Sequence, residues 1–307
     1  MSPTINISSQ QHLAIALSGL ANFFLGASSL YWKALSEFSS ITLVVYRVTL
    51  SSAILALFLL VFRRLNHFKA LTLKLIITHC AAATMIAFNW GAFIWSSING
   101  HLLESGLGYL LAPFISIGMG CLIYHEPITP RKILSTIVAL SSVASLIFLS
   151  ENLNHWTYLL IATTWGSYTY LKKTTSLDAI SGLFIETFFL TVILTFVVWT
   201  FDFTLTRPND SSYQNLSIWL AGVVSVTPLL MFSFATNKIP LSLTGFLQFI
   251  LPLTLFSIGI FSYKQAIPSL SLTLLMVTAG ILATLLAYDI STSTSSKTRS
   301  TRDEKSL

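Results

Sequence analysis

The chain has 307 residues, of which 54% are hydrophobic and only 9% are charged, whereas about a quarter of the residues in an average soluble domain are charged. A mean hydropathy of +0.76 excludes a disordered protein, and no basic run with interleaved aromatic residues favours nucleic-acid binding. We therefore expect a membrane protein whose surroundings are the lipid bilayer and whose partners do not include nucleic acid.

Ten stretches of about 20 mostly apolar residues, the length with which a helix crosses roughly 30 Å of hydrocarbon, follow one another along the sequence. They are residues 12–32, 40–62, 73–95, 103–124, 132–150, 156–172, 179–201, 217–236, 241–262 and 268–288. The first stretch has no basic segment before it and no small-residue cleavage site, so we predict a retained helix and not a signal peptide. The sequence thus predicts an all-α membrane protein with ten transmembrane helices.

The basic residues predict the orientation. If both termini face the cytoplasm, thirteen of the 17 lysines and arginines fall in cytoplasmic segments and three, Lys33, Arg207 and Lys264, fall outside. Arg47 lies within a span. Because basic residues collect on the cytoplasmic side, we predict a cytoplasmic N-terminus, residues 1–11, and a disordered cytoplasmic tail, residues 291–307, which is rich in Ser, Thr and charge.

The two halves of the sequence resemble each other. When the second half is aligned with the first so that Pro252 lies on Pro113, the ninth span matches the fourth and the seventh matches the second. A shift longer by one residue aligns the sixth span with the first. The matched pairs also include Gly120 with Gly259, Tyr124 with Tyr263 and, by the longer offset, Gly26 with Gly166. Five spans in each half, 12–150 and 156–288, give the halves opposite orientations, and such inverted repeats are an architecture of transporters.

Three ionisable side chains, those of Arg47, Glu104 and Glu186, lie within the spans, where a charge is costly unless it is paired or hydrated. The same offset that matches the two prolines places Arg47 on Glu186 at similar depths, so the two could pair or line one cavity. In a binding site, Arg47 would hold an anionic group of the substrate, and Glu186 would meet a cationic group or a proton. The alternative is a buried ion pair that only fixes helix packing. Glu104 is either an external gate or proton-coupling group, or a hydrated acid at a helix start.

Two prolines at matched positions, Pro113 and Pro252, should kink their helices and free backbone carbonyls, as happens at the borders of binding cavities. Tyr109 and Gln248 each lie four residues before one of these prolines. Both side chains can hydrogen-bond a ligand, and the alternative is a hydrogen bond between helices.

Aromatic and amide side chains in the third span, Asn89 and Trp90, could bind a planar or cationic group together with Trp165 and Tyr168 of the sixth. No catalytic motif or phosphate-binding loop occurs, and Cys80 and Cys121 have no C-x-x-C neighbour. The histidines, among them His79, do not cluster at metal-ligand spacing. We expect no enzyme activity, no cofactor and no metal.

The sequence resembles the RarD-type branch of the EamA permeases, within the drug/metabolite transporter superfamily, over nearly its whole length. The similarity is carried by NWGAFIWSSINGHLLESGLGYLLAPFISIGMGCLIYHEPIT, residues 89–129, by LDAISGLFIETFFL, residues 177–190, and by PLSLTGFLQFILPLTLFSIGIF, residues 240–261. The resemblance implies ten helices in two inverted repeats, an inner-membrane location and secondary transport of small metabolites or drugs.

Within this resemblance, Arg47, Glu104, Glu186 and Gln248 match positions that recur in the RarD pattern. One departure is Gln265, which stands where an acidic residue usually ends the ninth span, whereas Glu126 is present at the matched place in the first half.

These observations predict a secondary permease that moves a small metabolite or drug-like solute by alternating access through a mid-membrane site. One alternative is an exchanger for an adenosyl-type or other amphoteric metabolite, and another is a non-transporting membrane sensor or scaffold. Assembly as a homodimer is left open, as are the substrate and the direction of transport.

Overall fold

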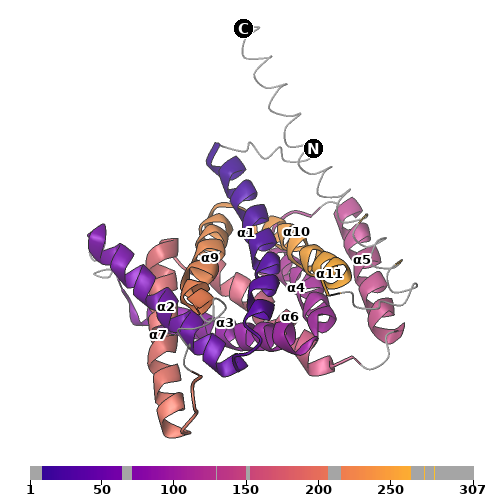
Figure 1. The fold of residues 1–307 in the computed structure, drawn as a ribbon. Coiled ribbons are helices and arrows are strands. Elements are labelled where there is room, and N and C mark those ends of the chain that lie inside the picture. The colour runs from indigo at the N-terminus through magenta and orange to yellow at the C-terminus, as the bar shows by residue number, and fades with distance from the viewer. Residues whose placement is uncertain are drawn as a thin grey trace.

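A computed structural model describes residues 9–63, 71–128, 130–149, 153–206 and 216–263, together with Thr273 and Gly280. Every regular element in these residues is a helix (Figure 1). The helices are α1 (Ser9–Ala34), α2 (Ser40–Val61), α3 (Leu73–Asn99), α4 (Leu102–Leu122), α5 (Pro130–Leu149), α6 (His155–Thr174), α7 (Ala179–Thr200), the 3-10 turn η2 (Ile218–Leu220), α9 (Ala221–Lys238), α10 (Leu241–Gln248) and α11 (Ile250–Phe261).

Within the described residues, seven segments are long and apolar enough to cross a membrane. They correspond to the first four predicted spans and to the seventh, eighth and ninth. The fifth and sixth predicted spans form helices α5 and α6, whose apolar stretches are shorter or interrupted by polar residues such as Lys172. The tenth predicted span, 268–288, lies outside the described residues apart from Thr273 and Gly280. The all-helical, multi-pass prediction is therefore confirmed, while the number ten is not.

Polar residues at the starts of four helices explain where they begin. Ser39, Thr72, Asn154 and Asp178 each accept a hydrogen bond from the backbone N–H three residues later, at 3.2–3.3 Å. Such N-caps satisfy donors that have no partner within the helix. At the other end of α3, Gly100 has a φ of 83° and allows the chain to turn directly into α4.

The two matched prolines have different effects on their helices. Helix α4 runs without interruption through Pro113, whereas the predicted ninth span is broken at Phe249 into α10 and α11. Pro252 has no N–H to donate to the carbonyl of Gln248, and the N–H of Phe249 bonds to the carbonyl of Phe246 at 3.3 Å, which tightens the turn. The prediction of a discontinuity is thus correct for the ninth span.

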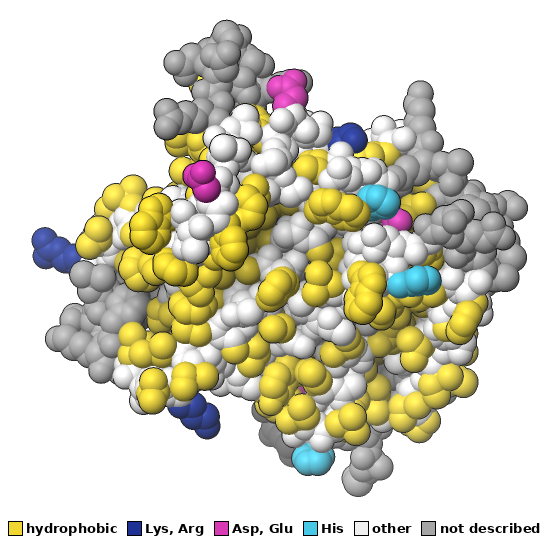
Figure 2. Space-filling model, turned by 90° about the horizontal axis from the view of Figure 1, so that it is seen from below, with side chains coloured by type: hydrophobic (Ala, Val, Ile, Leu, Met, Phe, Trp, Pro, Cys, Tyr) yellow, Lys and Arg dark blue, Asp and Glu magenta, His cyan; other side chains and the backbone are white. Residues whose placement is uncertain are grey.

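The helices pack as a bundle in which α4 lies against α6, α10 and α11, while α1 lies against α9, and α2 against α7 (Figure 1). Helix α3 packs on both α6 and α7, and α5 lies at the margin (Figure 1). Figure 2 shows hydrophobic side chains over much of the face seen from below, with few charged ones. An apolar exterior of this kind suits contact with lipid.

A glycine in α4 permits close approach to α6. A Cβ at Gly108 would lie 2.7 Å from Cβ of Ile161 and 2.8 Å from the carbonyl of Tyr158, whereas one at Gly118 in the same helix would meet nothing within 4 Å. We expect Gly108→Ala to destabilise the protein by about 1–3 kcal/mol through overpacking. Gly118→Ala, the matched control, should be neutral or slightly stabilising. Thermal unfolding in detergent compares the two variants, and equal melting temperatures would contradict the close packing of α4 on α6.

Candidate functional site

The guanidinium of Arg47 is held between two indole rings. Arg47 is the eighth residue of α2 and is 2% exposed. Its central carbon lies 4.0 Å from the ring centroid of Trp90 on α3 and 5.0 Å from that of Trp32 on α1. Both contacts are favourable cation–π interactions, and neither uses the N–H donors of the guanidinium for a hydrogen bond to an acceptor oxygen.

Two donors of this guanidinium have no hydrogen-bond acceptor among the described residues. These donors are the buried Nε and Nη1, and within the same part of the chain no carboxylate forms an ion pair with Arg47. A buried charge normally has a partner because its desolvation is costly. Arg47 therefore presents in-plane donors of the kind that bind a carboxylate or a phosphate.

Glu186, by contrast, is the centre of a complete network. It is the eighth residue of α7 and is fully buried. Its Oε1 accepts from Nζ of Lys172 on α6 at 2.9 Å and lies 2.7 Å from Nδ1 of His79 on α3. Oε2 accepts from the hydroxyl of Tyr168 at 3.1 Å. Nε2 of His79 in turn lies 2.7 Å from Oγ1 of Thr175. We call His79, Lys172 and Glu186 the acid–base cluster.

Arg47 and Glu186 do not form an ion pair with each other. Their contacts on α3 are Trp90 and His79, which are eleven positions apart along the helix, a rise of about 16 Å. The charged partner of Glu186 is instead Lys172, a residue that the charge pattern of the sequence places in a cytoplasmic loop. The two matched charges belong to two separate sites.

Asn89 and Tyr109 use their polar atoms within the bundle. The hydroxyl of Tyr109 donates to Oδ1 of Asn89 at 2.7 Å. Nδ2 of Asn89 donates to the carbonyl of Ile161 and to Oγ1 of Thr164, at 3.3 and 3.2 Å. These bonds join α3, α4 and α6, and they position Trp90, the neighbour of Asn89, over Arg47. The contacts of Tyr109 fit the alternative of a hydrogen bond between helices, and Asn89 is its partner.

Gln248 also bonds at both ends of its amide. Its Nε2 donates to Oγ1 of Thr169 on α6 at 2.6 Å, and its Oε1 accepts from Oγ of Ser116 on α4 at 3.1 Å. It therefore connects the end of α10 to two other helices, as the helix-to-helix alternative expects. Pro113 lies within α4, and Pro252 is the third residue of α11.

Glu104 lies in the first turn of α4, where an acid interacts favourably with the helix dipole. Its Oε1 is 3.0 Å from Nδ1 of His101, whose ring stacks on that of Trp95 with centroids 4.7 Å apart. The residue is 7% exposed, so it is more buried than a hydrated helix-start acid would be. It is not in the acid–base cluster.

Two charged residues that the sequence did not mark as functional hold helix ends together. The carboxylate of Glu126 accepts from the N–H groups of Leu241 and Ser242, at 2.7 and 2.8 Å, and so caps α10. Nζ of Lys173 donates to the carbonyls of Thr236 and Ile239 at the end of α9, at 3.1 and 2.6 Å. Glu126, which follows the fourth predicted span, therefore binds the start of the ninth. Gln265, at the matched position of the second half, lies outside the described residues.

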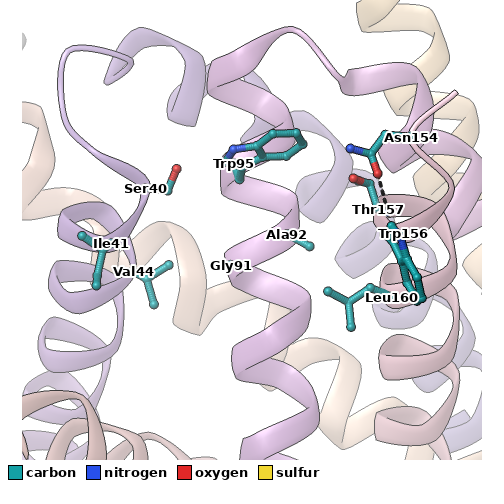
Figure 3. A pocket seen from close by; sticks show the side chains of 10 residues that line it. All are labelled: Ser40, Ile41, Val44, Gly91, Ala92, Trp95, Asn154, Trp156, Thr157 and Leu160. Carbon is teal, nitrogen blue, oxygen red and sulfur yellow. Dashed lines mark hydrogen bonds between the residues drawn. The ribbon is translucent and has the colours of Figure 1, made fainter. Parts of the chain in front are cut away.

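A pocket of about 590 Å³ lies between α2, α3 and α6 (Figure 3). Its lining includes Val44, Gly91, Trp95, Trp156 and Leu160, and Asn154 caps α6 at its edge. The lining is mostly apolar, and it includes neither Arg47 nor Glu186. No group of three His, Cys, Asp or Glu residues within the described ranges is suited to hold a metal.

Comparisons with known proteins decide the family. No family model matches the chain. An uncharacterized transporter of Vibrio cholerae is 31% identical over 256 residues, which are 80% of this chain and 82% of the relative. Protein RarD of Streptomyces exfoliatus is 30% identical over 79% of this chain and 78% of the relative. The chain belongs to the RarD family of transporters. Protein RarD of Escherichia coli is a further relative, 27% identical over 83% of this chain and 88% of its own length.

The fold of this RarD-family chain also resembles that of a solved structure. The two superpose with a TM-score of 0.63 over 90% of this chain and 98% of the other, at 14% sequence identity. This likeness concerns the fold alone. Together with the seven apolar helices, membership of the RarD family confirms the predictions of a permease-type, multi-pass membrane protein.

Proposed function

We propose that this chain is a secondary-active permease that moves a small solute with an anionic group by alternating access. In this proposal the solute binds at Arg47, in a central site between two inverted five-helix repeats. The chain spans the inner membrane with both termini on the cytoplasmic side. The two repeats are residues 12–150 and 156–288. The relatives' names, which are those of transporters, support transport and suggest that the chain is not an enzyme.

Glycine contacts support the inverted repeat. The offset that aligns Pro113 with Pro252 also aligns Gly106 with Gly245 and Ile117 with Phe256. A Cβ built at Gly106 would lie 3.0 Å from Phe256, and one built at Gly245 would lie 2.8 Å from Ile117. Each half thus places the same glycine against the same position of the other half. Two exchanged contacts of this kind are expected if a twofold axis relates the halves, and such an axis permits them to rock around a central site.

A second pair of glycines follows the same rule. Gly26 faces Cβ of Thr254 and Gly166 faces Cβ of Ile115, each with a built Cβ at 2.8 Å. The helix contacts correspond as well, since α1 packs on α9 as α6 packs on α3. The proposal of ten helices requires that residues 268–288 form the partner of α5.

The unsatisfied edge of Arg47 is the observation that carries the choice of solute. A guanidinium presents its N–H donors in its plane, which favours a planar carboxylate or one face of a phosphate. Trp32 and Trp90 offer apolar surface beside it. The site is less suited to an amphoteric solute. Glu186, which would bind its cationic group, already bonds to Lys172, His79 and Tyr168.

Thermal stabilisation of the purified protein tests the proposal. The panel consists of matched pairs, each a carboxylate or phosphate compound and its neutral amide or ester, drawn from amino acids, nucleosides, sugars and amphenicols. A ligand that binds only the folded state raises the melting temperature by mass action. We expect at least one anionic member, and not its neutral partner, to stabilise the wild-type protein. Stabilisation by the neutral members alone would overturn the proposal of an anionic solute.

A sensor or scaffold would also bind a ligand, so transport needs its own measurement. Proteoliposomes that contain the protein should take up the stabilising compound, labelled with a radioisotope, faster than vesicles without protein. Binding without uptake would favour the sensor alternative over the permease.

A further inference from the structure

The acid–base cluster has a composition that packing alone does not require. Glu186, Lys172 and His79 come from three helices, α7, α6 and α3, and each is at most 1% exposed. A carboxylate and an ammonium would be sufficient for a buried ion pair. The third member is a histidine, the side chain whose ordinary titration lies nearest to physiological pH.

Hydrogen-bond accounting shows how the cluster can take up a proton. Oε1 of Glu186 is an acceptor, so Nδ1 of His79 donates to it and carries hydrogen in either charge state. In the neutral form Nε2 accepts from the hydroxyl of Thr175, whose oxygen also accepts from the N–H of Leu177 at 3.3 Å. When a proton from water binds Nε2, the N–H donates to the same oxygen and the hydroxyl hydrogen turns away. The imidazole can therefore change charge while it keeps the same two hydrogen-bond partners.

The charges around His79 act on an added proton in opposite directions. Glu186 from α7 favours the imidazolium, and Lys172 from α6 opposes it, with Tyr168 from α6 bound to the far oxygen of Glu186. Helices α1, α2 and α4 also pack on α3, and within the described ranges they bring no ion pair or hydrogen bond to this ring. Glu186 therefore offsets part of the repulsion that an imidazolium would meet from Lys172.

The backbone of α7 is shaped around this imidazole. A Cβ at Gly182 would lie 2.7 Å from Cε1 of His79 and 3.4 Å from Nζ of Lys172. The ring therefore sits directly on the helix backbone, in a position that no larger residue at 182 would allow.

From these contacts we infer that His79 is a proton-binding residue through which solute movement is coupled to the movement of protons. The proton site stands on its own geometry, whereas the coupling rests on the proposed solute site at Arg47. Helix α3 connects the two, because it carries both His79 and Trp90. A small shift of this helix on protonation would alter the stacking over Arg47, as coupling between two sites requires.

Nitrogen-15 NMR of histidine side chains tests the proton site without any solute. The chain has six histidines, and His79→Gln assigns one signal by its loss. We expect the signal of His79 to show a second proton binding at Nε2 when the pH is lowered. Lys172→Met, which removes the neighbouring ammonium, should change the response of the His79 signal to pH. His155→Gln, at the exposed start of α6, should leave the signal of His79 unchanged. A His79 that keeps one charge state throughout would overturn the inference.

Proteoliposomes with a trapped pH dye test the coupling. Each anionic compound of the matched panel is added outside, and vesicles without protein correct for permeation of the free acid. We expect compound-dependent proton flux in the wild-type protein and in His155→Gln, and its loss in His79→Gln. A His79 that titrates while no compound moves protons would overturn the coupling. Proton flux driven only by neutral compounds would instead contradict the solute site at Arg47 and leave the proton site in place.

Discussion

Replacing Arg47 with methionine is expected to lower solute transport about 100-fold, because the loss of a buried charge-assisted contact costs about 2–5 kcal/mol of binding. The same change should leave the melting temperature without solute equal to that of the wild type or higher. Arg47 has no carboxylate partner among the described residues, so its removal relieves a buried charge, and methionine still fills the space between Trp32 and Trp90. Initial uptake rates in proteoliposomes and thermal unfolding measure the two quantities.

Arg47→Lys is the matched comparison for this variant. Lysine retains the charge but loses the planar, bidentate fork and its stacking on the indoles, so we expect activity between those of wild type and Arg47→Met. If Arg47→Met destabilises the fold as much as it lowers transport, the residue has a structural role and the solute site lies elsewhere.

Replacing Glu186 with glutamine is expected to destabilise the protein by about 3–5 kcal/mol, because it leaves the ammonium of Lys172 buried without its counter-charge. Oε1 of Glu186 accepts from Lys172 at 2.9 Å, and both side chains are at most 1% exposed. The double variant Glu186→Gln with Lys172→Met should recover most of this loss, since neither buried charge remains. Thermal unfolding of the wild type, both single variants and the double variant gives the coupling energy.

A second double-variant comparison combines Glu186→Gln with Arg47→Met. We expect the destabilisation by Glu186→Gln to be unchanged in the Arg47→Met background, because the two residues share no contact. Rescue by Arg47→Met and not by Lys172→Met would show that the charges pair across the repeats after all.

Hydropathy and residue spacing predicted the helical, multi-pass fold and most helix bounds. The third predicted span, 73–95, ends before its helix does because Gly100, and not a loss of hydrophobicity, terminates α3 at Asn99. The equivalence of Arg47 and Glu186 was also visible, and each is indeed the eighth residue of its helix. Local pattern is informative here because each span must satisfy its own backbone in lipid.

The residues that contact Glu186 could not be predicted from local sequence patterns. Lys172 lies in the last turn of α6 and His79 in α3, and nothing in their local sequence signals that they meet Glu186. His79 is 107 positions away from Glu186 along the chain, and Lys172 belongs to a segment that the charge pattern assigns to a loop. A signal did exist, since the offset that aligns Gly26 with Gly166 also places Trp32 on Lys172. Arg47 contacts Trp32, and Glu186 contacts Lys172. The contact partners of the two matched charges therefore also occupy matched positions in the two halves.

Calorimetric binding of one matched pair, a carboxylate compound and its amide, to the wild-type protein and to Arg47→Met tests the central claim most directly. The account predicts that the wild type prefers the carboxylate at least tenfold and that Arg47→Met binds the two compounds equally, because the edge of the guanidinium provides the discrimination. An undiminished preference for the carboxylate in Arg47→Met would contradict the assignment of the solute site to Arg47.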